Sequence, residues 1–325
     1  MKALKWISGF FLGLLVLIAV YILWVTLYYN DLSIEQYEVK YGSANLQQFN
    51  LDELNVYYTV EGKGPPLLLL HSHFFNLQMW DPWVEQLKDD YTLIRFDLPS
   101  HGFTGPDPTD DYSMARSLEI IDGLMAHLAI DTFHIVGSSL GGNIAFNYAA
   151  SRDTRVESLI LINSGGFRKD SDRGGRGGDL PQWADYFLYL LPKFAYRYFF
   201  SWMVVDKSLA TTERIEHFMD SFRRDGNRVA EMQRIRQFKR GKSEELLAQI
   251  TAPVLILWGE DNPQLPVRLA DKFENGLKNA KSVEKIIFAD TGHLLPIESP
   301  IRSASETKAF IEAHTKIESL TGGGD

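Results

Sequence analysis

The pentapeptide GSSLG at residues 137–141 is the segment of this sequence most suited to covalent chemistry. The apolar run FHIVG leads into it and GGNIAFNYAA, with helical composition, continues from it, so the segment predicts a tight turn from a strand into a helix. Glycines on either side of the turn let the two backbones approach, and the central Ser139 then projects its hydroxyl outward. Ser138 lies one residue off this pattern and is expected to point elsewhere. Ser139 is therefore the candidate nucleophile.

A serine hydroxyl becomes a good nucleophile only when a base takes its proton, and a neutral imidazole is the usual base. His293 fits this role because it follows Gly292 in a loop directly after the apolar run VEKIIF. His71 and His101 lie at the end of one predicted strand and in the loop after the next, and we interpret both as structural. The sequence thus pairs Ser139 with His293.

Short apolar runs alternate with helical patterns along the rest of the chain. The predicted strands are residues 46–50, 54–60, 66–71, 91–96, 132–137, 156–162, 253–258 and 283–288. The predicted helices are residues 78–89, 114–128, 140–151, 267–277 and 301–315. Runs such as LLLL and VLIL are continuously apolar, which is typical of parallel strands that are buried on both faces. The fold class predicted is α/β: a doubly wound, mostly parallel, eight-stranded sheet flanked by helices.

One long segment interrupts this alternation. Residues 165–180 are rich in Gly, Arg and Asp and resemble a loop, and the sequence that follows to about residue 250 is helical and aromatic. Its aromatic side chains are Trp183, Tyr186, Phe187, Tyr189, Phe194, Tyr196, Tyr198, Phe199, Phe200 and Trp202. We predict a helical cap at residues 165–250, whose aromatic residues form its own core and line an apolar acyl pocket. The core of the protein then comprises residues 31–164 and 251–325.

Residues 6–29 read WISGFFLGLLVLIAVYILWVTLYY and contain no charge. A helix needs about 20 apolar residues to cross a bilayer, and a cleaved signal peptide would be shorter and end in small residues. Residues 1–30 are therefore interpreted as an uncleaved transmembrane anchor. Lys2 and Lys5 precede the segment, whereas Asp31 and Glu35 follow it. This asymmetry predicts a cytoplasmic N-terminus and an extracytoplasmic catalytic domain, which in bacteria would be periplasmic.

Composition excludes several classes of function. The formal net charge is −9 and no basic run offsets it, so nucleic-acid binding is not expected. The chain has no cysteine, which excludes a disulfide scaffold, a thiolate nucleophile and a Cys-ligated metal. The histidines are scattered without a metal-ligand spacing, and we expect neither a metal nor another cofactor.

Several segments in the right order resemble the α/β-hydrolase family, over about residues 41–315. Besides GSSLG, they are HSH at 71–73, FDLPSHGFT at 96–104, LILWGEDNPQLP at 255–266 and DTGHLLPIESP at 290–300. The resemblance implies a Ser–acid–His triad and an oxyanion hole formed by the backbone N–H groups of His73 and Leu140. Ser72 stands where the family usually has glycine, which makes the donor at His73 the less certain one.

The acid is the position at which the sequence departs from the family. Counting back from Pro266, the usual acid position holds Asn262, and Asp261 precedes it. A second position used by some members holds Asn163. We expect Asp261 to be the acid, with Asn262 as the alternative orienter of His293. Asp290 or Asp97, acting from elsewhere, would be a third solution.

These features together predict a cofactor-free serine hydrolase that acts through an acyl-enzyme on lipophilic carboxylic esters, like an esterase or lipase. One alternative is hydrolysis of a carbon–carbon bond in a vinylogous diketone by the same triad. Another is a non-catalytic binding module with a degenerate acid position, which Asn262 favours and the intact Ser139 and His293 oppose.

Overall fold

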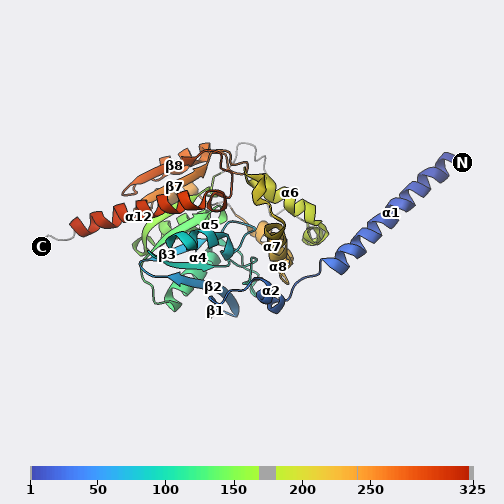
Figure 1. The fold of residues 1–325 in the computed structure, drawn as a ribbon, viewed down its shortest axis with the longest axis horizontal. Helices are drawn as coiled ribbons and strands as arrows, with labels where there is room; N and C mark the ends of the chain where they lie inside the picture. Colours follow the sequence, from blue (N-terminus) through green and yellow to red (C-terminus); the bar gives the residue numbers. More distant parts are fainter. Residues whose placement is uncertain (1, 168–180, 240, 322–325) are drawn as a thin grey trace.

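A computed structural model of the chain describes residues 2–167, 181–239 and 241–321, and an eight-stranded sheet forms its centre (Figure 1). The strands are β1 (Leu46–Leu51), β2 (Leu54–Gly62), β3 (Pro66–Leu70), β4 (Thr92–Phe96), β5 (Phe133–Ser138), β6 (Val156–Ile162), β7 (Val254–Gly259) and β8 (Val283–Phe288). Their order is β1-β2-β4-β3-β5-β6-β7-β8. β1 with β2 and β2 with β4 are antiparallel, and every other pair is parallel. The predicted fold class is confirmed.

Helices cover both faces of the sheet, as the continuous apolar strands require. In β3, Leu68 and Leu70 belong to the core under α4 (Met114–His127), α5 (Leu140–Ser151) and α10 (Arg268–Gly276). The alternate residues Leu67 and Leu69 belong to the core under α3 (Asp81–Leu87) and α12 (Pro300–Thr321). The predicted helix at 78–89 is divided into a 3₁₀ turn, η1 (Leu77–Trp80), and α3, because Pro82 is tolerated only in the first turn of an α-helix.

The chain between β6 and β7 contains η4 (Gln182–Leu190), α6 (Lys193–Met203), η5 (Lys207–Leu209), α7 (Thr212–Arg223), α8 (Asn227–Gln237) and α9 (Ser243–Leu247). We call residues 181–239 the cap. Most of the loop predicted at 165–180 lies outside the described residues. Inside the cap, Tyr196 and Phe200 of α6 pack against Phe218 and Phe222 of α7. The cap is thus held together by its own aromatic core.

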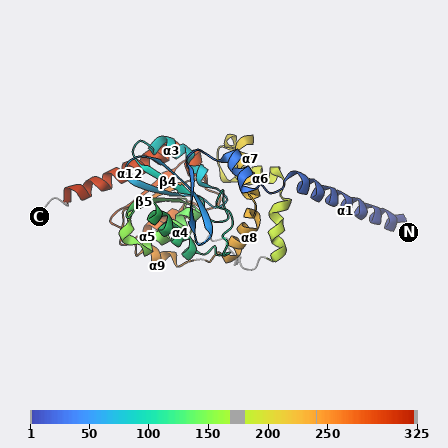
Figure 2. The same cartoon turned by 90° about the horizontal axis from the view of Figure 1, so that it is seen from below.

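The N-terminal helix α1 (Lys2–Tyr28) projects from the end of the molecule that carries the cap, and α12 leaves at the opposite end (Figures 1 and 2). Residues Trp6–Leu27 have a mean hydropathy of 2.7 and are long and apolar enough to cross a membrane. Only 6% of this segment is buried, so α1 is not a core helix of the domain.

A short helix that the sequence analysis missed, α2 (Ile34–Tyr41), connects α1 to the sheet. It begins at a capping box formed by Ser33 and Gln36. It is attached to α7 by a hydrogen bond of 2.9 Å between the hydroxyls of Tyr37 and Ser221 and by an ion pair between Lys40 and Asp220. The segment that leaves α1 is therefore joined directly to the cap.

Candidate active site

Ser139 occupies a strained position between β5 and α5. Its backbone angles of φ 54° and ψ −108° lie in a region that residues other than glycine rarely adopt. The turn is close-packed: a Cβ at Gly137 would lie 2.2 Å from the carbonyl oxygen of Gly141, and a Cβ at Gly141 would lie 2.2 Å from that of Leu70. Only glycine fits at these two positions. Their presence in the sequence is explained by this approach of strand and helix.

A chain of hydrogen bonds starts at the Ser139 hydroxyl. Ser139 Oγ lies 3.1 Å from Nε2 of His293, and Nδ1 of His293 lies 3.1 Å from Oδ1 of Asn262. All three side chains are buried, with Ser139 the most accessible at 9%. The oxygen of Asn262 also accepts from the backbone N–H groups of Gln264 and Leu265, at 3.0 and 2.9 Å. Because only an oxygen can accept these bonds, His293 must donate from Nδ1, and Nε2 is then the nitrogen that accepts from the Ser139 hydroxyl.

The loop that carries His293 is held by two polar side chains, the buried Asn163 and the half-buried Glu298. Asn163, at the end of β6, donates to the carbonyl oxygens of Gly292 and His293 at 3.1 and 2.9 Å. Glu298 accepts from the N–H groups of Gly292 and Leu294, each at 3.1 Å. Burial raises the pKa of Glu298 above its usual value, although these N–H groups partly oppose the shift. The cap contributes as well, because the N–H of His293 donates to the carbonyl of Met203 at 2.7 Å.

Asp261, which the sequence favours as the acid, does not lie beside His293. It is exposed, and its backbone N–H bonds to the carbonyl of Thr291 at 3.1 Å. Asn262 instead points inward and is only 5% exposed. The reason is local: the turn that leads from β7 toward α10 is closed on the side-chain oxygen of Asn262, so the residue beside it must face outward. The structure therefore places Asn262, and not Asp261, beside Nδ1 of His293.

The other acid candidates also lie elsewhere. Asp97 is fully buried and accepts from the N–H groups of Leu77 and Phe103 at 2.6 and 2.7 Å, which organises the loop after β4. Burial raises the pKa of Asp97 to about 7. Asp290 is exposed in the turn after β8. Asn163 reaches the backbone of the histidine loop and not the imidazole ring.

The loop after β3 brings His73 opposite Leu140. Both residues line the cavity that contains Ser139. Within the described part of the chain, neither backbone N–H has a hydrogen-bond partner. Two unpaired N–H groups beside a nucleophile can receive the charge that develops on a carbonyl oxygen during attack. This arrangement is the one expected of an oxyanion hole.

The serine that replaces glycine at position 72 fits the loop without blocking it. Its hydroxyl bonds to that of Ser138 at 2.8 Å, and its N–H contacts Sδ of Met79. Ser138 is fully buried in this contact and turned away from His293.

His71, also buried, accepts from the N–H of Leu98 at 3.0 Å, and burial lowers its pKa to about 3. These contacts agree with a structural role for His71.

The catalytic cavity has a volume of about 750 Å³ and lies between the core and the cap. Its apolar lining comes from Met114, Leu140, Ile144, Ile235, Phe238 and Leu265. None of the aromatic residues from Trp183 to Trp202 is among the residues that line it. The prediction that these residues form the inner wall is therefore corrected: α8, α5 and the start of α4 form it. The sequence offers no periodic signal that would have selected those residues.

A cluster of charged side chains at the edge of this cavity joins the cap to the oxyanion loop. Glu231 of α8 is fully buried and bonds to Nε2 of His73 and, at 3.1 Å, to the hydroxyl of Ser100. Burial raises the pKa of Glu231, but His73 and Arg234 outweigh that effect and hold it below the usual value. The ligand atoms of His73, His101 and Glu231 lie within 4.8 Å of one another, as in a metal site. Nε2 of His101 already accepts the N–H of Phe74 at 3.2 Å, however, so the cluster fits a hydrogen-bond network better than a metal ion.

The profile of the Alpha/beta hydrolase family matches residues 67–306, and the chain belongs to this family. Two relatives agree with this assignment. The uncharacterized hydrolase YugF of Bacillus subtilis is 26% identical over 271 residues, which are 82% of this chain and 98% of that protein. Monoacylglycerol lipase abhd6-B of Xenopus laevis is 28% identical over 295 residues, which are 85% of this chain and 82% of that protein.

Among solved structures, the fold is similar to that of CumD, a meta-cleavage product hydrolase from Pseudomonas fluorescens IP01. The TM-score is 0.71 at 22% identity, with 82% of this chain and 97% of that chain covered. At this identity the likeness concerns the fold alone. Family and relatives together support a hydrolase.

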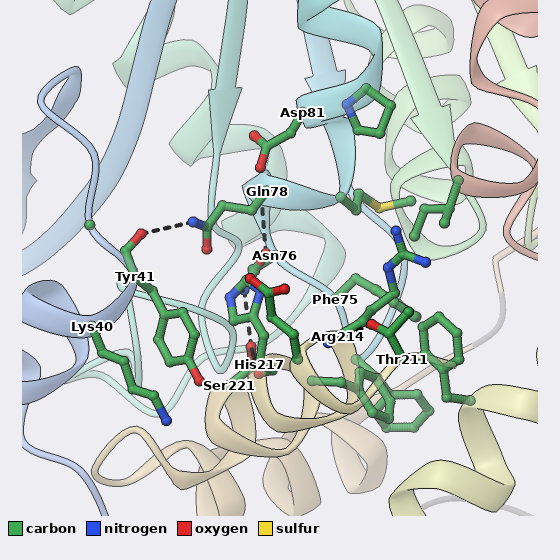
Figure 3. Close-up of a pocket in the computed structure, with 18 residues that line it drawn as sticks. Lys40, Tyr41, Phe75, Asn76, Gln78, Asp81, Thr211, Arg214, His217 and Ser221 are labelled. Atoms are coloured by element: carbon green, nitrogen blue, oxygen red, sulfur yellow. Dashed lines mark hydrogen bonds between the residues drawn. The ribbon is translucent and has the colours of Figure 1, made fainter. Parts of the chain in front are cut away.

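A second cavity, of about 490 Å³, lies on the other side of the oxyanion loop, between α2, η1 and α7 (Figure 3). His217 stands at its centre: its ring stacks on Tyr41, with centroids 4.3 Å apart, and its Nε2 lies 3.2 Å from Nδ2 of Asn76. Burial lowers the pKa of His217 to about 4, although the charge of Asp220 opposes the shift. The folded protein therefore keeps this imidazole neutral.

We predict that His217→Gln makes the protein less sensitive to acid. Between pH 6.5 and 4 the unfolded chain binds a proton at His217 and the folded protein does not, so stability is lost as the pH falls through this window. The lost stability amounts to about 2–3 kcal/mol. Glutamine does not titrate in this range. As the pH falls from 7 to about 4.5, the melting temperature of the variant should therefore decrease less than that of the wild type. A constant difference across this range, measured by thermal melts, would contradict the assignment.

Proposed function

We propose that this protein is a membrane-anchored serine hydrolase that cleaves lipophilic carboxylic esters through an acyl-enzyme. Ser139 is the nucleophile, His293 the general base, and Asn262 the residue that orients the base. The observation that carries the proposal is the continuous hydrogen-bond chain from Ser139 through His293 to Asn262 at the wall of a large cavity.

The reaction follows from where the protons and charges go. Nε2 of His293 takes the proton of Ser139 as Oγ attacks the ester carbonyl. The N–H groups of His73 and Leu140 receive the negative charge on the carbonyl oxygen. His293 then gives its proton to the departing alcohol, which leaves an ester between the acyl group and Ser139. A water molecule, activated by His293 in the same way, releases the acid.

Asn262 makes this site differ from the usual triad. Its side-chain oxygen holds the imidazole in the tautomer that the reaction needs, as an acid would. It carries no charge, however, and cannot stabilise the imidazolium that forms during attack. The proposed enzyme therefore has a correctly oriented but weaker base.

The substrate class rests on the cavity and on the relatives. A volume of about 750 Å³ with several aliphatic walls is suited to an acyl chain of intermediate length. The Xenopus relative is a monoacylglycerol lipase, whose substrate is a lipophilic ester. The anchor is part of the same proposal, because α1 would keep the enzyme at the membrane in which such esters dissolve. We retain the orientation with a cytoplasmic N-terminus, on the charges that flank α1.

The nucleophile is tested with a fluorophosphonate, which labels activated serines. We predict that wild-type protein is labelled and that Ser139→Ala is not, while its circular dichroism spectrum is unchanged. Ser138→Ala is the matched control: this hydroxyl is bonded to Ser72 and turned away from His293, so the variant should still be labelled. Labelling of Ser139→Ala would place the nucleophile elsewhere. Absence of labelling in folded wild-type protein would favour a binding module.

The orienting residue is tested by adding a charge. We predict that Asn262→Asp raises kcat on an activated ester by about tenfold or more, because the new carboxylate stabilises the imidazolium. In a serine protease, the reverse change costs about 10⁴ in kcat, part of which is due to the wrong tautomer. Asp261→Asn is the control and should leave kcat nearly unchanged, because Asp261 is exposed. A loss of activity in Asp261→Asn, together with no gain in Asn262→Asp, would return the role of the acid to Asp261.

The substrate class is tested with p-nitrophenyl esters of increasing acyl length. Each further buried methylene should add up to ~0.8 kcal/mol of transition-state binding, or about fourfold in kcat/KM, until the cavity is filled. Ile235→Ser, in the wall of the cavity, should flatten this rise and leave acetate hydrolysis little changed. A kcat/KM that stays level or falls beyond acetate in the wild type would contradict a lipophilic acyl site.

A further inference from the structure

The outer surface of the cap carries large aromatic residues that the fold does not cover. On α6, Tyr196 and Phe200 face the cap core, whereas Phe194 and Tyr198 are 74% and 75% exposed. Trp202, eight residues after Phe194, continues the same stripe along the helix. A helix at the surface of a soluble domain normally presents polar residues on its outer face. α6 instead carries large aromatic residues on its outer face as well, next to the exposed Arg197.

The neighbouring 3₁₀ helix η4 repeats this pattern. Four large side chains within eight residues of η4 are 41–72% exposed: Trp183, Tyr186, Phe187 and Leu190. Together with the outer residues of α6 they form what we call the aromatic face, defined as Trp183, Tyr186, Phe187, Leu190, Phe194, Tyr198 and Trp202. Tyrosine and tryptophan are enriched where a protein meets the boundary between water and lipid.

The contact between η4 and α1 fixes the height of this face relative to the proposed membrane span. The hydroxyl of Tyr21 donates to the carbonyl oxygen of Leu190 at 2.7 Å, and Val25 is only 3% exposed. Tyr21 lies six residues before Leu27, where the apolar span ends, which is about 9 Å along a helix. The span of 22 residues is about 33 Å long and barely exceeds a hydrocarbon core of about 30 Å. When α1 crosses the bilayer, Leu190 must therefore lie beside the span, below the polar surface.

We propose that the aromatic face of η4 and α6 is a lipid-docking surface, immersed in the same leaflet that α1 enters. The bilayer is the occupant because η4, which carries part of the face, contacts α1 at Leu190. The cap and α1 also lie at the same end of the molecule (Figures 1 and 2). Leu190 is suited to this environment, since its carbonyl oxygen accepts a hydrogen bond from Tyr21. The inference rests on the anchor in the proposed function and adds that the cap itself enters the membrane.

The full-length chain is well suited to a direct test because it contains no cysteine. Single variants Phe194→Cys and Tyr198→Cys are labelled with an environment-sensitive fluorophore and reconstituted into vesicles of phosphatidylethanolamine and phosphatidylglycerol. A fraction of the phospholipid carries a doxyl quencher, placed high on the acyl chain for positions 194 and 198 and near the end of the chain for position 16. Val16→Cys, within α1, reports on insertion of the anchor. Lys278→Cys is the matched exposed control. Lys278 precedes β8 and so lies near the N-terminal ends of the parallel strands, whereas the cap follows the C-terminal end of β6.

We expect lipid quenching at positions 194, 198 and 16, and none at 278. Quenching at 16 alone, with labels at 194 and 198 open to aqueous iodide, would overturn the docking surface and leave the anchor intact. Labels at 194 and 198 that are shielded from both quenchers would also overturn it, in favour of a second copy of the chain. No quenching at 16 would overturn anchor and docking together. Fluorophosphonate labelling of the same samples reports separately on the hydrolase, which does not depend on any of these outcomes.

Discussion

The close approach of β5, α5 and β3 around Ser139 is the constraint on which the rest of the site depends. A Cβ added at Gly137 would lie 2.2 Å from one carbonyl oxygen, and a Cβ added at Gly141 would lie 2.2 Å from another. The turn therefore has no room for a side chain at either position. This tightness holds Ser139 at a positive φ and lifts its hydroxyl toward His293. It also brings the start of α5 against the loop after β3, so the N–H groups of Leu140 and His73 face the same cavity. The proposed nucleophile and the proposed oxyanion hole both depend on this one backbone geometry, whose strain of about 1–3 kcal/mol the surrounding sheet must offset.

The cap takes part in the site through three connections. The carbonyl of Met203 accepts the N–H of His293, and Glu298 joins the histidine loop to the N–H of Val205. On the other side of the cavity, Glu231 of α8 holds His73. Base and oxyanion loop are thus both attached to the cap, so a movement of the cap would alter the catalytic geometry itself and not only access to the cavity.

The sequence predicts the sheet, Ser139 and His293 because each depends on local signals: apolar runs, glycine spacing, and a loop directly after a strand. The orienter could not be chosen in the same way. Asp261 and Asn262 differ by one position in a loop, and the choice is decided by which side chain closes the turn onto Gln264 and Leu265. The cap posed a similar difficulty. Its aromatic residues are evident in the sequence, but which of them face α7 and which face outward depends on how α6 packs.

Asn262 and the aromatic face can be understood together as properties of an enzyme that meets its substrate at high local concentration. A neutral orienter lowers the driving force for proton transfer and so limits kcat. In the proposed function, α1 holds the enzyme at a bilayer in which its ester substrates are concentrated. Such an enzyme can sustain flux with a slower chemical step than one that captures dilute substrate from water. Nδ2 of Asn262, the atom that an aspartate would replace by oxygen, is buried without a hydrogen-bond partner among the described residues. A second oxygen there would need a donor as well, and this missing donor is a physical reason why asparagine costs less than a charged carboxylate in the buried turn.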